Sequence, residues 1–237
     1  MTTEEIIKLE KYLFKRLSQL YSDNIFTVNY TMREVLTSNH RLSFAIYGKY
    51  NNYITIRPSL TLFSDQIKTE VHKIFEIDDK VCYHSLFNKQ LITQNCENIF
   101  ASYTDGFIFN KISSEKDIDK MIFNIDAFME GGGLEFIKNT NSLEGIESFL
   151  NKPISQFTLL EIRDPLIQRK LRKFYKDPRI IRSGIIARYS IKQHAGKKLI
   201  NQYLALFEEV KVISDMCKQI IAFYDQRRSK SKTQPTV

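Results

Sequence analysis

The spacing of apolar residues changes along this chain, and that change is the strongest constraint on its fold. Three segments alternate apolar and polar residues with a period of two: Phe26, Val28, Tyr30 and Met32; Leu42, Phe44 and Ile46; and Ile54 and Ile56. Such alternation is typical of strands with one buried face. We therefore predict an antiparallel meander of three strands, with residues 107–112 as a candidate fourth strand.

Elsewhere apolar residues recur every three or four positions, which is the period of an amphipathic helix. This pattern covers residues 2–20, 64–75, 114–129, 142–150, 164–175 and 177–191. Thr2 with Glu5 predicts a capping box at the start of the first helix, and Ser64 and Ser114 predict further N-caps. The predicted fold class is α+β: an N-terminal helix and antiparallel meander of three to four strands, followed by a mainly helical C-terminal half with a long final helix.

The final helix carries the most regular pattern. Its apolar residues alternate steps of four and three: Leu199, Tyr203, Leu206, Val210, Ile213, Cys217, Ile220 and Tyr224. They predict one helix of about 39 Å over residues 197–224. The apolar neighbours Ile200, Phe207 and Ile221 widen the stripe beyond a two-stranded seam, which favours packing within its own domain. A homodimer through the same helix is the alternative.

These patterns predict two regions and a tail. Residues 1–113 form the sheet region, residues 114–228 form a helical region packed on it, and residues 229–237 form a disordered tail. The N-terminus lacks the uninterrupted apolar run of a signal peptide, and no window has the apolar length of a membrane span. Three widely spaced cysteines predict free thiols. We therefore expect a cytoplasmic protein with no membrane association.

Charge is distributed unevenly between these regions. Residues 163–237 carry 18 Lys and Arg against six Asp and Glu, a formal charge of +12, whereas residues 1–162 carry 17 against 21. Within residues 163–198 the ratio is 12 to two. Such a segment predicts an anionic partner, which is either an acidic protein or a nucleic acid. A solvated surface without a partner is the third interpretation.

The basic residues are predicted to lie on one side of the helix that follows Asp164. Its apolar residues predict an inward stripe: Leu166, Ile167, Leu171, Phe174 and Tyr175. The candidate partner-binding residues are the cations on and after this helix: Arg169, Lys170, Arg172, Lys173, Lys176, Arg179 and Arg182. Arginine suits bidentate recognition of carboxylate and phosphate.

Catalytic motifs are sparse. Arg188 and His194 stand in an R-x5-H arrangement that resembles the motif of the HEPN ribonucleases, in which an Arg and a His act on RNA. Six residues turn an ideal helix through about 240°, so these two side chains share a face only if the helix ends near Gln193. No Cys/His set, nucleophile elbow or phosphate-binding glycine loop is complete. We expect no metal or cofactor, and an enzyme is the less favoured interpretation.

A longer resemblance concerns the order of the elements. Its segments are Tyr53-Ile-Thr-Ile-Arg-Pro-Ser-Leu, Asp65-x-Ile67, Val71-His-Lys-Ile-Phe75, Gly133-Leu-Glu-Phe-Ile, Ser142-Leu-Glu-x-Ile-x-x-Phe-Leu150 and Arg182-Ser-Gly-Ile-Ile-Ala187. In this order they resemble uncharacterised bacterial α+β domains of the toxin-immunity type. The resemblance implies a non-enzymatic module that binds a toxin-like or regulatory protein. The alternative function is a nucleic-acid-binding or RNA-processing accessory protein, including a HEPN-like ribonuclease.

Overall fold

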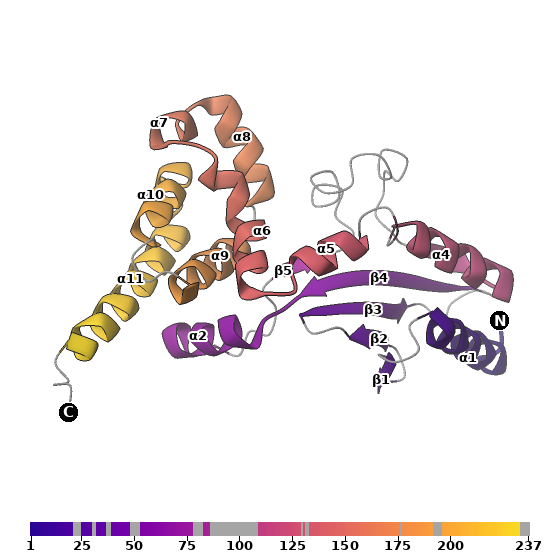
Figure 1. Cartoon of the computed structure of the whole chain (residues 1–237). Coiled ribbons are helices and arrows are strands. Elements are labelled where there is room, and N and C mark those ends of the chain that lie inside the picture. Colours follow the sequence, from indigo (N-terminus) through magenta and orange to yellow (C-terminus); the bar gives the residue numbers. More distant parts are fainter. Residues whose placement is uncertain are drawn as a thin grey trace. The chain divides into compact units, whose positions relative to one another are not determined.

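The computed structural model describes residues 1–20, 25–29, 32–36, 39–47, 53–77, 83–85, 109–128, 130, 133–175, 177–191 and 196–232 (Figure 1). Contacts within the chain define two compact units. The first consists of Met1–Leu62 with His84–Asn139, and the second of Phe63–Tyr83 with Thr140–Val237.

The first unit contains most of an antiparallel sheet. Its strands are β1 (Ile25–Asn29), β2 (Met32–Leu36), β3 (His40–Tyr47), β4 (Ile54–Leu62) and β6 (Phe109–Ile112), and β5 (Tyr83–Ser85) lies where the two units divide the chain. The strand order is β1-β2-β3-β4-β5, and β6 also pairs with β4. Strands β1 to β4 form a meander, in which Phe44 of β3 faces Pro58 of β4.

This architecture corrects the predicted fold class. The sheet has six strands among the described residues, not three to four, partly because the alternation over residues 26–32 belongs to two strands. Asn29 pairs with Met32 across the β1–β2 hairpin, so the alternation continues through the connection and gives no sign of it. Helices nevertheless contain most residues of the regular elements, so the described chain is mainly helical. The single long final helix is also wrong, as shown below.

Two helices of the first unit are joined by polar and apolar contacts. Helix α1 (Thr3–Leu20) packs on α4 (Glu115–Phe128), and α5 (Leu134–Asn139) follows α4 in the chain. Tyr12 and Arg16 of α1 both donate to the carboxylate of Asp119 on α4, at 2.9 Å from the Tyr12 hydroxyl and 2.8 Å from the Arg16 Nε. Where the structure describes their side chains, the predicted apolar stripes are buried: Ile6, Leu9, Leu13 and Leu17 on α1, and Ile118, Ile122 and Ile125 on α4. Leu20 and Met129 lie outside this description. The capping box of Thr2 and Glu5 is confirmed.

The described part of the second unit is almost entirely helical. It contains α2 (Asp65–Phe75), α6 (Leu143–Ser155), α7 (Leu159–Ile162), α8 (Pro165–Phe174), α9 (Pro178–Ile191), α10 (Gly196–Leu206) and α11 (Lys211–Lys232). Helix α9 is central, because residues 180–187 are all buried and α2, α6, α10 and α11 all contact it. The charged residues of α9 therefore belong to a helix that is buried in the core, and not to a surface helix.

A polar network lies inside this helical core. The Tyr203 hydroxyl of α10 donates to Asn151 Oδ1 of α6 at 2.8 Å, and Asn151 Nδ2 donates to the carbonyl oxygen of Gly184 on α9 at 2.8 Å. The rings of Tyr175 and Tyr203 meet edge to face at 5.1 Å, and burial raises the pKa of both hydroxyls. The network satisfies polar groups where water is excluded and fixes three helices relative to one another.

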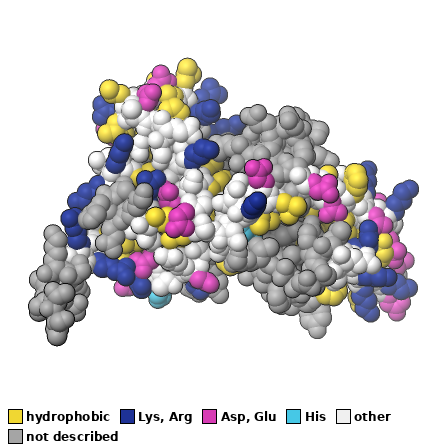
Figure 2. Space-filling model, viewed as in Figure 1, with side chains coloured by type: hydrophobic (Ala, Val, Ile, Leu, Met, Phe, Trp, Pro, Cys, Tyr) yellow, Lys and Arg dark blue, Asp and Glu magenta, His cyan; other side chains and the backbone are white. Residues whose placement is uncertain are grey.

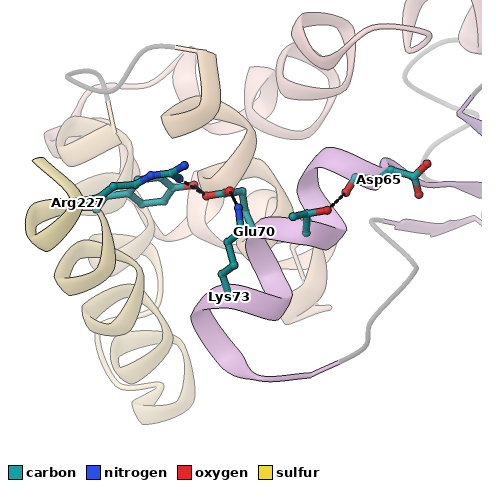
Figure 3. A network of polar contacts seen from close by, with 6 residues as sticks. Asp65, Glu70, Lys73 and Arg227 are labelled. Atoms are coloured by element: carbon teal, nitrogen blue, oxygen red, sulfur yellow. Dashed lines mark hydrogen bonds and ion pairs between the residues drawn. The ribbon is translucent and has the colours of Figure 1, made fainter. Parts of the chain in front are cut away.

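A second polar contact joins α2 to α11. Glu70 of α2 is only 10% exposed in its side chain, and its carboxylate accepts from Arg227 Nη1 at 2.8 Å and from Lys73 Nζ at 2.9 Å (Figure 3). The Tyr224 hydroxyl donates to the same carboxylate at 3.2 Å. The Tyr224 ring also stacks on Tyr189 of α9, with 4.4 Å between centroids. Glu70 is therefore a structural carboxylate.

The predicted final helix is interrupted. Helix α10 ends at Leu206 and α11 begins at Lys211, and the amide of Val210 bonds to the carbonyl of Phe207 at 2.8 Å in a tighter turn. Arg172 Nε donates to the freed carbonyl of Leu206 at 2.9 Å, which compensates for the lost helical bond. Apart from Val210, which is 40% exposed, the residues of the stripe are buried. The stripe therefore packs within the helical unit, as its wide apolar face predicts.

The units also differ from the predicted regions. A division at residue 113 places α4 and α5 with the helices, whereas they belong to the sheet unit, and α2 belongs to the helical unit. Packing partners decide this, and they are distant in sequence. Helix α11 continues to Lys232, beyond the predicted start of the tail, and residues 233–237 lie outside the described residues.

Candidate functional site

Helix α8 carries four of the seven candidate partner-binding residues, and its start is well defined. Asp164 is the N-cap, and its Oδ1 accepts from the amides of Leu166 at 2.8 Å and Ile167 at 3.2 Å, while Pro165 occupies the first turn. Leu171 and Phe174 are buried. The predicted inward position of Leu166 is wrong, because its side chain is 78% exposed.

Three of the candidate cations form a continuous exposed stripe with Leu166. Arg169, Lys170 and Lys173 are exposed and follow Leu166 at three, four and seven positions, which lie on one helix face. Within the part of the chain that the structure describes, none of the three forms an ion pair. Helix α8 itself contains no acidic residue. We call Leu166, Arg169, Lys170 and Lys173 the α8 stripe.

An open depression of about 510 Å³ runs beside the α8 stripe. It is lined by Pro165, Gln168, Arg169, Arg172 and Lys173. Arg172 is partly committed to the fold, since its Nε donates to Leu206 and its guanidinium lies 6.0 Å from the Phe207 ring. Arg169 and Lys173 thus belong to the stripe and also line the depression.

The remaining candidates do not belong to this surface. Arg179 forms a two-point contact with Asp177, at 2.7 Å between Nη2 and Oδ2 and 3.1 Å between Nε and Oδ1. Burial raises the pKa of Asp177, but the bonds and charge of Arg179 lower it on balance. Arg182 is buried at 8% exposure, with its guanidinium 5.7 Å from the Phe75 ring. Lys176 lies outside the described residues.

Of the alternative catalytic pair, the structure describes only Arg188. Arg188 lies on α9 and binds Glu147 of α6, at 2.6 Å from Nε and 2.5 Å from Nη2 to Oε1. Both side chains are largely buried, and Glu147 also accepts from Asn151 Nδ2 at 2.7 Å. Arg188 is therefore part of the core network described above. His194 lies outside the described residues.

Sequence reasoning missed the apolar residues that reach the surface beside the cations. Leu160 on α7 is 81% exposed, and Leu159 is 45% exposed. Figure 2 shows hydrophobic side chains next to Lys and Arg side chains at the top of the view, where Figure 1 places α7 and α8. The helical geometry of α8 contains a usable signal, since Leu166 lies about 140° from Leu171 but only about 40° from Lys170.

Comparisons with protein-family models, with curated proteins and with solved structures find no match for this chain. In the described residues, no group of three or more His, Cys, Asp or Glu side chains is arranged to hold a metal ion. Among the same residues, every helix is either too short or too polar to cross a bilayer. Cys217 is a free, buried thiol, and burial raises its pKa to about 12.

Proposed function

We propose that this protein is a non-enzymatic binding module that recognises an acidic surface of a protein partner through α8. The observation that supports this proposal is the α8 stripe, where Arg169, Lys170 and Lys173 are exposed without ion-pair partners among the described residues. Cations with a structural role, such as Arg179 and Arg188, instead form ion pairs with carboxylates of the same chain.

Such a surface selects acidic partners and increases the rate at which they associate. Clustered cations raise the local concentration of an acidic partner and increase its association rate, while like charges repel basic proteins. The resemblance to toxin-immunity domains gives the type of partner, which is a toxin-like or regulatory protein. A binding module of this kind needs no metal or nucleophile.

The catalytic alternative is less well supported. A HEPN-like ribonuclease needs an arginine that is available to RNA, and Arg188 instead binds a largely buried carboxylate. Binding of nucleic acid through the α8 stripe is separated from protein binding by its salt dependence. Neutralising several phosphates makes affinity fall steeply as salt rises, whereas a protein interface with apolar contacts is less sensitive.

Charge reversal tests the proposal. The variant R169E/K170E/K173E is compared with K8E/K11E/K15E, which reverses three exposed lysines on α1 and changes the net charge equally. Immobilised wild-type protein captures partners from nuclease-treated extract of the source cell, and a captured protein is then produced and titrated by calorimetry. We expect the α8 variant to lose affinity at least tenfold and the α1 variant to keep it.

Two results would contradict the proposal. Equal affinity of the two variants for the purified partner would show that net charge, and not α8, governs binding. Capture that disappears after nuclease treatment, together with wild-type binding to an RNA of about 20 nucleotides that weakens steeply with salt, would show a nucleic-acid-binding protein instead.

A further inference from the structure

Two exposed leucines flank the turn that joins α7 to α8. Leu160 is 81% exposed and Leu166 is 78% exposed, whereas Ile162 between them is fully buried. Single exposed apolar residues are common on protein surfaces, so exposure alone has no functional meaning. Here, however, both leucines lie at the corner formed by α7, the turn and α8, and Leu166 is itself part of the α8 stripe.

The backbone at this corner is held in place before any partner arrives. Thr158 and Glu161 form a capping box at the start of α7, with 2.7 Å between the Thr158 amide and Glu161 Oε2. Asp164 caps α8 two residues before Leu166. Ile162 anchors the short helix in the core. A surface that is already ordered loses little conformational entropy on binding, which favours affinity.

The order of side chains along α8 defines what fits on it. Leu166 comes first, Arg169 and Lys170 follow one turn later, and Lys173 follows after another turn, about 11 Å in total. A complementary ligand has an apolar end and carboxylates spaced along the next two turns. An amphipathic helix with leucines on one face and acidic residues beside them has this arrangement.

The fixed spacing of the α8 stripe favours a helix over a flat or uniform ligand. Arg169 and Lys173 of the stripe also line the open depression, so a ligand that approaches from that side reaches the same cations. A nucleic-acid duplex presents mainly phosphates along its length and few apolar groups for Leu160 or Leu166. An anionic bilayer covers the leucines, but its head groups have no fixed spacing along α8.

We propose that the partner binds with an acidic amphipathic helix, which packs its apolar face on Leu160 and Leu166 and directs its carboxylates at Arg169, Lys170 and Lys173. This inference rests on the proposed function and deepens it, because it assigns an apolar anchor to a surface so far defined by charge. The leucines supply the specificity of the interface, and the cations orient the incoming helix.

Two synthetic peptides test the inference. Both have about 18 residues, or five turns, and an identical composition of Leu, Ala and Glu. In the first peptide the leucines recur every three or four residues and share one face, and in the second they are distributed around the helix. We expect the wild-type protein to bind the first peptide about tenfold more tightly, as measured by fluorescence anisotropy at 150 mM salt.

Leucine truncation then locates the anchor. L160A and L166A should each weaken binding of the first peptide about tenfold and remove the preference between the peptides. The control V212A shortens another well-exposed apolar side chain, 67% exposed, on α11 of the same unit and should change nothing. Because all three positions are exposed, thermal melts of the variants should coincide with that of the wild type.

The outcomes separate this inference from the proposed function. If both peptides bind equally and both are lost in R169E/K170E/K173E, the apolar anchor is refuted and charge recognition stands. If neither peptide binds, the helical ligand is refuted, and the captured partner alone decides the proposed function. If phosphatidylserine vesicles bind more tightly than the first peptide and L166A weakens vesicle binding, a membrane surface is the occupant and the inference is overturned. If an RNA binds more tightly than the first peptide, a nucleic acid is the occupant and the inference is likewise overturned.

Discussion

Asn151 donates a hydrogen bond to the carbonyl oxygen of Gly184, and this 2.8 Å contact joins α6 to α9 inside the helical unit. The absence of a side chain at Gly184 permits the approach, since a Cβ atom there would lie 2.4 Å from Asn151 Oδ1. Asn151 is itself fixed by Tyr203 and Glu147, so it has little freedom to move away.

Gly184→Ala should therefore destabilise the protein, although alanine is the better helix former. We expect a loss of about 1–3 kcal/mol, typical of overpacking in a well-packed core. Urea unfolding followed by circular dichroism measures it. Gly145→Ala, in the first turns of α6, serves as a control and should leave stability unchanged or slightly higher. An equal gain from both substitutions would show that the contact is not close.

Shortening a buried side chain of the final apolar stripe should destabilise the protein in α10 and in α11 alike. Leu206→Ala in α10 and Ile213→Ala in α11 each remove a buried aliphatic side chain, 0% and 3% exposed, and should cost about 2–5 kcal/mol. Val212→Ala, beside Ile213 but 67% exposed, should cost less than about 0.5 kcal/mol. Thermal melts of the three variants measure this difference in stability. Equal melting temperatures would show that the stripe is not part of a core.

The carboxylate of Glu70 should contribute to stability more than an exposed carboxylate does. Glu70→Gln removes the charge that Arg227 and Lys73 bind, and we expect a loss of about 1–3 kcal/mol. Asp215→Asn is the matched control, because its contact with Lys218 is exposed and 3.8 Å long, and it should cost less than about 0.5 kcal/mol. Chemical denaturation of both variants tests the difference, and equal losses would contradict it.

Arg188 should behave as a structural residue. Arg188→Ala leaves Glu147, 13% exposed, without its cation, so we expect a loss of about 3–5 kcal/mol. Arg179→Ala breaks a more exposed pair with Asp177 and should cost less. A ribonuclease assay on Arg188→Lys and His194→Ala gives a second readout. Loss of RNA cleavage in these variants, with an unchanged melting temperature, would favour the HEPN-like alternative.

His40 should make the fold sensitive to acid. It is buried, with its ring 5.8 Å from that of Phe136, and burial lowers its pKa to about 4 from the ordinary value near 6.5. A lowered pKa means that the fold favours the neutral imidazole. Its contribution is therefore complete above about pH 6.5 and is lost as the pH falls toward 4, by up to about 3 kcal/mol.

The test compares wild-type protein with His40→Gln by urea unfolding at several pH values. The difference in stability between the two proteins should shrink by about 2–3 kcal/mol between pH 7 and pH 4, because glutamine does not titrate. Carboxylates also lose stability in this range, but they do so equally in both proteins. A difference that stays constant with pH would show that His40 titrates normally.

Local patterns predicted many of the elements. The stripes of α1 and α4 are buried as the three- and four-residue spacing indicates, and Thr2 caps α1 as expected, because these features depend on residues within one or two turns. The same reasoning missed the β1–β2 hairpin, where alternation runs through the connection. It also predicted α10 and α11 as one helix. No residue near Leu206 in the sequence indicates that Arg172 binds the Leu206 carbonyl oxygen.

The candidate surface was predicted by charge and corrected by packing. The excess of cations after residue 163 belongs to the sequence and needs no fold to be seen. Which cations are available is decided by contacts between distant residues: Arg182 is buried and Arg188 binds Glu147, 41 positions earlier, whereas Lys170 and Lys173 stay exposed. The exposure of Leu166 is likewise a property of packing, since burial of α8 through Leu171 and Phe174 turns Leu166 outward.

The sequence by itself therefore determined where most helices and strands form, because hydrogen bonds, caps and amphipathic spacing act over a few residues. It also determined the charge of the last third. The tertiary structure decided how the chain divides into units, where the last helix breaks and which cations and leucines share a surface. These outcomes depend on which side chains fill the space around α9 and α8, and that competition for buried volume is settled only when all the elements pack together.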